Sequence, residues 1–237
     1  MTGRIPVFEL LRAGKRPARR LYVLRGAKGL EAIVEAAGAV PVEYVSRQQL
    51  GQLAGGENHQ GVLVQAAPLP LAPLEHWLAG ADADTLAVLL DSIEDPHNFG
   101  AILRSAAACG ADAVVFGKDR AAPLSAAAVK AAAGAAEHIH LIRVTNLART
   151  VDTLRKSGFW IAALDADAPQ LLWEADLRGR LGLVIGNEGR GIRRLVREKC
   201  DFHLRIPLEG PVPSLNASVS AGIALAECMR QRRTAAP

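Results

Sequence analysis

Short apolar runs alternate with segments of helical character from residue 85 onward, and this alternation constrains the fold more than any other feature. The runs are too short for helices of ordinary length, so we expect each of them to be a strand. They occupy residues 86–90, 113–116, 139–144, 160–164, 183–185 and 202–206. Helices are expected at residues 99–109, 125–136, 147–156, 192–199 and 217–232. Such alternation predicts an α/β fold in which a parallel sheet is covered by helices on both faces.

The first 67 residues predict a separate, smaller α/β domain. Strands are expected at residues 21–24, 42–45 and 61–64, and a helix at residues 29–37. The segment Pro68-Leu69-Pro70-Leu71-Ala72-Pro73 follows, and prolines at this density stiffen a chain into an extended linker. We therefore predict a first domain at residues 1–67, a linker at 68–80 and the larger α/β domain at 81–237.

Positive charge is concentrated near the N-terminus. Residues 1–70 hold nine Lys or Arg against five Asp or Glu, which accounts for the whole net charge of +4 because the rest of the chain is balanced. Such a patch can neutralise phosphates and so favours nucleic acid as a partner, although a solvated basic surface explains the charge equally well. The candidate RNA-binding residues are Arg4, Arg12, Lys15, Arg16, Arg19 and Arg20.

Several classes of protein are disfavoured by the composition. The three cysteines, Cys109, Cys200 and Cys228, are widely separated and lack the spacing of a zinc site or of a disulfide framework. No apolar stretch is long enough to span a bilayer, and residues 1–6 lack the apolar segment of a signal peptide. We therefore expect a protein of the reducing cytoplasm that uses neither a membrane segment nor a metal.

Polar or glycine-rich loops follow three of the expected strands, at the edge where open α/β sheets bind their ligands. The first loop leads to Asn98, which occupies the position of a helix N-cap, and to Arg104 within an otherwise apolar helix. Capping alone would explain Asn98. Arg104 either needs a polar partner inside the fold or projects toward a phosphate or ribose.

The other two loops lie late in the chain. Gly186-Asn187-Glu188-Gly189-Arg190-Gly191 lacks both the Lys-Ser/Thr end of a P-loop and the glycine order of a dinucleotide-binding fold. As a simple turn, it would place Glu188 at the start of the helix that follows. The loop at 208–216 is stiffened by two prolines and ends in Ser214 and Asn216, either of which could cap the final helix.

In this order, the three loops resemble the signature motifs of the SpoU family of RNA 2′-O-methyltransferases. The matching pieces are the asparagine and arginine of residues 98–104, the N-E-G of residues 187–189 and the S-L-N of residues 214–216. The resemblance implies S-adenosylmethionine as cofactor, a sheet whose C-terminal segment threads a trefoil knot, and a homodimer. It further implies active-site roles for Asn98, Arg104, Glu188, Ser214 and Asn216, and a cofactor pocket lined by Gly186, Ile206 and Leu215.

The first domain resembles the ribosomal-protein-like RNA-binding module of bacterial 23S ribosomal RNA guanosine-2′-O-methyltransferases. The match rests on residues 3–11 (GRIPVFELL) and on His59-Gln60-Gly61-Val62. The resemblance therefore implies a guanosine ribose of 23S rRNA as the substrate. Glu209 and Pro211 depart from the family pattern in a loop near the expected substrate, which leaves the identity of the base open.

Three alternatives stay open at this point. One is a transfer-RNA methyltransferase of the same family. Another is a non-catalytic RNA-binding or ribosome-assembly protein, which the intact Arg104, Glu188 and Asn216 disfavour. A nucleotide-dependent oxidoreductase is disfavoured because no glycine fingerprint opens the sheet. The proton acceptor is also open, since an arginine resists deprotonation and Arg104 is equally suited to stabilising a developing alkoxide.

Overall fold

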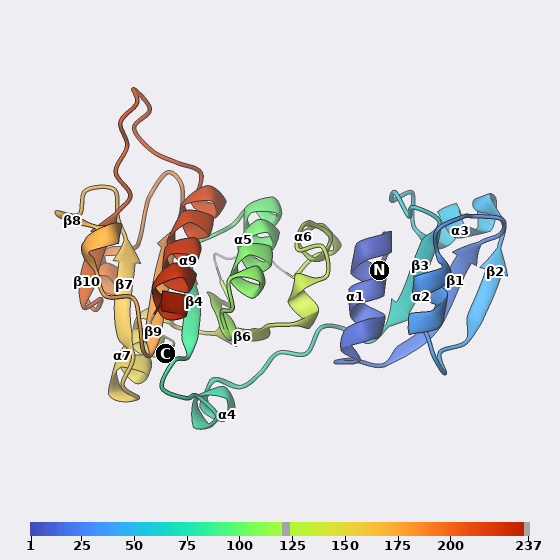
Figure 1. Ribbon diagram of the computed structural model, residues 1–237, viewed down its shortest axis with the longest axis horizontal. Coiled ribbons are helices and arrows are strands. Elements are labelled where there is room, and N and C mark those ends of the chain that lie inside the picture. Colours follow the sequence, from blue (N-terminus) through green and yellow to red (C-terminus); the bar gives the residue numbers. More distant parts are fainter. Residues whose placement is uncertain (120–123, 235–237) are drawn as a thin grey trace.

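The computed structural model describes residues 1–119 and 124–234 of the chain, so residues 120–123 and the last three of the predicted domain 81–237 lie outside the described residues. Two sheets organise the chain: a three-stranded sheet near the N-terminus and a seven-stranded sheet in the rest (Figure 1).

The larger sheet consists of parallel strands in the order β6-β5-β4-β9-β7-β10-β8. The parallel sheet predicted from the alternating pattern is thus confirmed, although the short edge strand β8 was not foreseen. The strands are β4 Leu86–Asp91, β5 Ala113–Gly117, β6 His140–Val144, β7 Trp160–Leu164, β8 Gln170–Leu171, β9 Leu181–Gly186 and β10 Phe202–Arg205.

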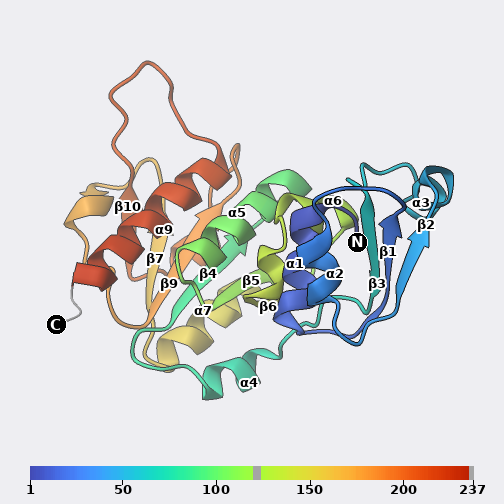
Figure 2. The ribbon, with the colours of Figure 1, turned by 45° about the vertical axis from the view of Figure 1, so that its right-hand side comes forward.

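Helices cover both faces of this sheet, because alternate residues of the interior strand β4 are buried on opposite faces. Leu86, Val88 and Leu90 of β4 are buried in one core with residues of α5 and α9. Ala87 and Leu89 are buried in a second core with residues of α4 and α7. Figure 2 shows α5 and α9 side by side on their face of the sheet. The helices are α4 Leu74–Ala79, α5 Pro96–Ala108, α6 Ala126–Ala131, α7 Leu147–Lys156, α8 Arg194–Arg197 and α9 Ala217–Thr234.

The N-terminal unit is a small α/β fold with the strand order β2-β1-β3, in which β2 is parallel and β3 antiparallel to β1. Leu21 and Val23 of β1 face α1 and α2, whereas Tyr22 lies in a second small core with Leu50 of α3. Its elements are α1 Arg4–Ala13, β1 Ala18–Leu24, α2 Glu31–Ala36, β2 Val42–Val45, α3 Arg47–Leu53 and β3 Val62–Ala66.

Two expected helices are shorter than the pattern indicated. The helix expected at 125–136 ends at Ala131, because Ala133 and Gly134 adopt left-handed backbone angles that stop an α-helix, and a 3₁₀ turn follows at Ala135–Glu137. The helix expected at 192–199 shrinks to α8, whose preceding residue Arg193 is extended. Helices α1 and α3 were missed, and α4 lies within the predicted linker.

Candidate active site

The carboxyl ends of β7, β9 and β10 surround a pocket of about 490 Å³, which is the size of a small-molecule site. The three residues predicted to contact a cofactor, Gly186, Ile206 and Leu215, all line it. Glu188 and Ser214 line it as well. The strand-end position expected for the glycine-rich and proline-rich loops is therefore the position of this pocket.

Asn98, Glu188 and Asn216 meet at the rim of this pocket, although they come from three distant segments; we call them the amide–carboxylate cluster. The Nδ2 group of Asn98 donates to Glu188 Oε1 at 2.8 Å. The Nδ2 group of Asn216 donates to Asn98 Oδ1 at 3.0 Å and also to Glu188 Oε1. Each of the three side chains therefore contacts the other two.

Capping of α5 is carried out by Asp95, so the expectation that Asn98 occupies the N-cap was wrong by three positions. The carboxylate of Asp95 accepts hydrogen bonds from the backbone N–H groups of His97 and Asn98. Pro96 occupies the first helical position, where its missing N–H costs nothing. The side chain of Asn98 is consequently left to bind Glu188.

Capping of α9 involves both remaining members of the cluster. Asn216 Oδ1 accepts from the backbone N–H of Ser218 at 2.9 Å and of Val219 at 3.3 Å. Glu188 Oε1 accepts from the backbone N–H of Ala217 at 3.3 Å, so this carboxylate lies at the start of α9 and not of α8. A helix N-terminus favours negative charge, which stabilises Glu188 in this place.

The turn that presents Glu188 is tightly closed. Asn187 and Gly191 exchange two backbone hydrogen bonds of 3.1 and 2.9 Å. A Cβ atom on Gly186 would lie 2.4 Å from the carbonyl carbon of Gly191, so only glycine fits at this position. The glycine that begins the motif is therefore required by the close approach of two backbone segments.

Arg104 and Ser214 are exposed residues that take no part in the cluster. Arg104 lies on α5, about 9 Å along the helix axis from Asn98, and makes no hydrogen bond or ion pair with the described residues. The polar partner inside the fold that the sequence suggested for Arg104 is therefore absent among the described residues. Its guanidinium is open to solvent and to any ligand that approaches α5.

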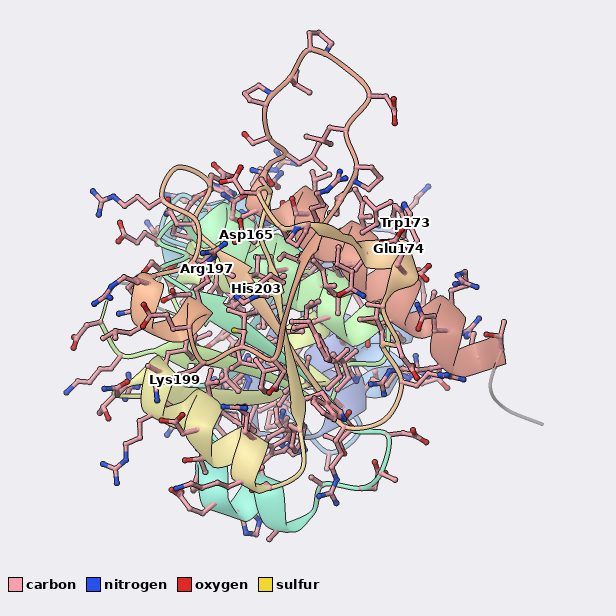
Figure 3. The ribbon with its side chains drawn as sticks, turned by 90° about the vertical axis from the view of Figure 1, so that its left-hand side faces the viewer. Asp165, Trp173, Glu174, Arg197, Lys199 and His203 are labelled. Atoms are coloured by element: carbon pink, nitrogen blue, oxygen red, sulfur yellow. The ribbon has the colours of Figure 1, made fainter. Side chains whose placement is uncertain are left out.

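An acidic residue on the pocket wall was missed by the sequence analysis. Asp165 follows β7 and lines the pocket, and its Oδ2 accepts from Arg197 Nε at 2.5 Å. His203 Nε2 lies 3.0 Å from the carbonyl oxygen of Arg197, and Figure 3 shows these three residues together at one end of the molecule. The same strand-end argument that selected the glycine-rich loop would have selected Asp165, because it directly follows an expected strand.

Two of the six candidate RNA-binding residues lie instead between the N-terminal unit and the larger sheet. Arg16 pairs with Glu137 at 2.6 Å, and the side chains of the two are 9% and 0% exposed. Lys15 Nζ donates to the carbonyl of Ile139 at 2.6 Å, and burial lowers the pKa of this amine. Neither cation is free to meet a phosphate in this arrangement, so for these two residues the prediction does not fit their surroundings.

The other four candidates are exposed. Arg4 donates to the carbonyl groups of Gln60 and Lys28, which ties the start of α1 to two loops. Arg20 pairs with Glu43 at 2.8 Å. Arg12 and Arg19 make no hydrogen bond or ion pair with the residues that the structure describes.

The described residues contain no group of three or more His, Cys, Asp or Glu side chains placed to hold a metal ion. None of their helices is both long and apolar enough to cross a membrane.

Comparison with known proteins identifies the family. Residues 85–226 match the SpoU rRNA Methylase family, and residues 2–72 match the family described as RNA 2′-O ribose methyltransferase substrate binding. The 23S rRNA (guanosine-2′-O-)-methyltransferase RlmB of Coxiella burnetii is 43% identical over 98% of this chain and 95% of its own length. RlmB of Pseudomonas aeruginosa is 41% identical over 95% of this chain and 94% of its own length.

A solved structure gives the same result at the level of the fold. The SpoU methyltransferase AviRb of Streptomyces viridochromogenes, in complex with the cofactor AdoMet, superposes with a TM-score of 0.82 at 25% identity, covering 100% of this chain and 91% of the other. With one family match spanning more than half of the chain and relatives above 40% identity over nearly all of it, the chain belongs to the SpoU family of RNA 2′-O-methyltransferases.

Proposed function

We propose that this protein transfers the methyl group of S-adenosylmethionine to the 2′-hydroxyl of a guanosine in 23S rRNA. The observation that carries the proposal is the amide–carboxylate cluster, which three distant motifs build at the rim of a single pocket. The relatives named as 23S rRNA guanosine methyltransferases support this substrate over a transfer RNA.

The pocket suits S-adenosylmethionine, the methyl donor of SpoU methyltransferases. Its volume of about 490 Å³ accommodates a nucleoside-sized ligand. The lining combines apolar Ile206 and Leu215 with the backbone of Gly186 and the carboxylate of Asp165, as a ligand with an adenine at one end and a charged amino acid at the other requires. When bound, this cofactor supplies a methyl group on a sulfonium, which is already a strong electrophile.

The residues of the chain then have to position the ribose and stabilise its oxygen as the proton leaves. A guanidinium does not give up its proton near neutral pH, so we assign Arg104 to stabilising the negative charge that develops on the 2′-oxygen. Asn98 and Glu188 orient the groups around the reacting 2′-oxygen. Ser214 and Asn216 shape the site that holds the ribose. Positioning of this kind is worth about 7–11 kcal/mol in favourable intramolecular cases.

RNA recognition is assigned to the N-terminal unit. We propose residues 1–67 as the RNA-binding domain, 68–80 as the linker and 81–237 as the methyltransferase domain, working on rRNA in the cytoplasm. Arg4, Arg12, Arg19 and Arg20 are its candidate phosphate contacts, since Lys15 and Arg16 are engaged between the units.

Two properties implied by the family resemblance complete the proposal: a trefoil knot and a homodimer. Strand β10 lies between β7 and β8, which both precede it in the chain, and this order is compatible with a threaded C-terminal segment. Exposed apolar side chains favour a dimer contact through the same region; these are Leu195, Leu208, Val212 and Val219. Sedimentation should give about twice the chain mass of 25.1 kDa, and a monomer at micromolar concentration would refute the dimer.

Binding of labelled S-adenosylmethionine, compared with binding of NAD, tests the proposal against the two alternatives that are not methyltransferases. A methyltransferase binds the first and not the second. A protein that binds RNA but neither cofactor would be the non-catalytic RNA-binding alternative, and binding of NAD alone would indicate an oxidoreductase.

A further inference from the structure

A buried carboxylate links the end of β4 to the loop that carries Glu188. Asp91, the last residue of β4, is fully buried. Its Oδ2 accepts from the backbone N–H of Arg193 at 2.7 Å, and its Oδ1 accepts from Arg193 Nε at 2.6 Å. A buried carboxylate needs such partners, so the position of Arg193 is set by Asp91.

A second link joins the same two segments one residue further along. Asn187 Nδ2 donates to the carbonyl of Ser92 at 3.0 Å. Ser92 itself has a φ of +62°, an uncommon angle for a serine, which directs its backbone differently from that of the strand before it. Asn187 Oδ1 accepts from the N–H groups of Gly189 at 2.9 Å and Arg190 at 3.2 Å, so this side chain also shapes the tip of the turn.

Glu188 lies between these two attachment points, and its own side chain is exposed. The orientation of its carboxylate toward Asn98 therefore depends on where the backbone of the turn is held. The turn also forms one wall of the pocket from Gly186 to Ile192. A shift at Arg193 would displace both the carboxylate and this wall.

We propose that Asp91 is a positioning residue for methyl transfer, acting through Arg193 and the 186–193 turn to place Glu188 in the amide–carboxylate cluster. The proposal rests on the proposed function. Asp91 lies outside the pocket lining and acts at a distance, whereas Asn187, which holds the same turn, lines the pocket itself. Displacements near 1 Å at a catalytic group can cost on the order of 100-fold in rate, which is the scale of effect expected here.

The chain offers a matched control for the chemistry of this link. Asp201 also accepts from a backbone N–H and from an arginine: its Oδ2 binds Ile161 N at 2.8 Å and its Oδ1 binds Arg155 Nε at 2.9 Å. Its side chain is 10% exposed, and it sits at the amino ends of β7 and β10, opposite the pocket. Asp201→Asn therefore measures the structural cost of losing such a link.

The test compares Asp91→Asn with Asp201→Asn. The two donors of Arg193 use different oxygens of Asp91, and asparagine replaces one of these oxygens with an NH₂ donor, so one donor of Arg193 loses its acceptor in this geometry. We expect Asp91→Asn to lower kcat on the order of 100-fold and to leave RNA affinity unchanged. Asp201→Asn should lose a comparable amount of melting temperature but keep its kcat. Arg193→Ala retains the backbone hydrogen bond to Asp91, so its kcat should lie between those of the wild-type protein and Asp91→Asn. The double variant Asp91→Asn/Arg193→Ala should have a kcat only slightly below that of Asp91→Asn. A kcat that tracks melting temperature equally in both Asp variants would overturn the proposal.

Amide hydrogen exchange reads the turn without relying on activity. Asp91→Asn should speed exchange at Gly189, Arg190 and Gly191 and leave the amides of β9 unchanged, whereas unchanged exchange at the turn would overturn the proposal. If Asp91→Asn does not fold, Arg193→Ala removes the same carboxylate–guanidinium bond and should show the same local exchange with a smaller loss of kcat. A normal kcat with normal exchange in that variant would overturn the proposal. A wild-type protein that transfers no methyl group would refute the proposed function. Amide hydrogen exchange would still show whether Asp91 holds the 186–193 turn in place.

Discussion

Glu188 is the residue on which the rest of the cluster converges. Every hydrogen bond of its side chain within the described residues uses Oε1, which accepts from Asn98, Asn216 and the backbone of Ala217. Three donors hold the carboxylate in one orientation, and the second oxygen is left for other partners. A single side chain thus connects the start of α5, the turn after β9 and the start of α9.

Replacing Glu188 with alanine removes this acceptor, while Asn216 still caps α9. We expect a folded protein whose kcat falls by roughly 10- to 100-fold, because a hydrogen bond to a charged group is worth about 1.5–3 kcal/mol. Steady-state kinetics measures the change, and circular dichroism checks the fold. Glu198→Ala, an exposed glutamate that pairs with Arg194, is the control and should keep its kcat. Equal kcat in the two variants would contradict the role of Glu188.

Among the elements, the turn after β9 is the one whose backbone geometry leaves the least freedom. Gly186→Ala would place a Cβ atom 2.4 Å from Gly191 C and 2.6 Å from Ile192 N, so the turn must move. Overpacking costs about 1–3 kcal/mol, and we expect S-adenosylmethionine affinity to fall tenfold or more by calorimetry. Gly210→Ala, in the exposed loop after β10, has nothing within 4 Å of the new atom and should bind normally. Normal affinity in a folded Gly186→Ala protein would place the cofactor elsewhere.

Strands of the larger sheet were the most predictable elements, because a run such as 86–90 is apolar at every position and buried on both faces. Short polar helices were not predictable. Helix α3 buries only Leu50 and depends on a capping box between Ser46 and Gln49, and α8 is a single turn set by Asp91. Periodicity carries little information over so few residues.

The residues that form the site could be predicted from the sequence, but the contacts between them could not. The motifs selected Asn98, Glu188 and Asn216, and the structure brings the three together. Asn98 does not cap α5, because the side chain of Asp95 already accepts hydrogen bonds from the free backbone N–H groups at the start of that helix. Asp91 was missed because a carboxylate at the end of a strand has no distinguishing pattern until its partner, 102 residues later, is in place.

At the scale of the whole molecule, five basic residues of the N-terminal unit divide into two groups. Lys15 and Arg16 bind the larger unit, and the Glu9 carboxylate lies 2.7 Å from His138 in the same contact. Arg12, Arg19 and Arg20 face solvent. The clustering of positive charge seen in the sequence therefore serves contact between the units as well as any contact with RNA.

Substitutions separate the two groups. Replacing Arg12, Arg19 and Arg20 with glutamine should lower the slope of log K against log salt for RNA binding by roughly 2–3, because each phosphate contact contributes about 0.7–0.9. Arg16→Ala should leave that slope unchanged but lower the free energy of unfolding by about 3–5 kcal/mol, since Glu137 stays buried without its partner. Filter binding and urea denaturation measure the two effects. A lower slope in Arg16→Ala would return Arg16 to the RNA surface.

The central claim is that this chain methylates a ribose 2′-hydroxyl of 23S rRNA and that Arg104 stabilises the oxygen as it reacts. The most direct measurement is mass spectrometry of nucleosides from 23S rRNA treated with the protein and isotopically labelled S-adenosylmethionine. We predict labelled 2′-O-methylguanosine with the wild-type protein and none with Arg104→Ala, although that variant should bind RNA and cofactor nearly normally. Label on a base, no labelled nucleoside with the wild-type protein, or full activity in Arg104→Ala would contradict the claim.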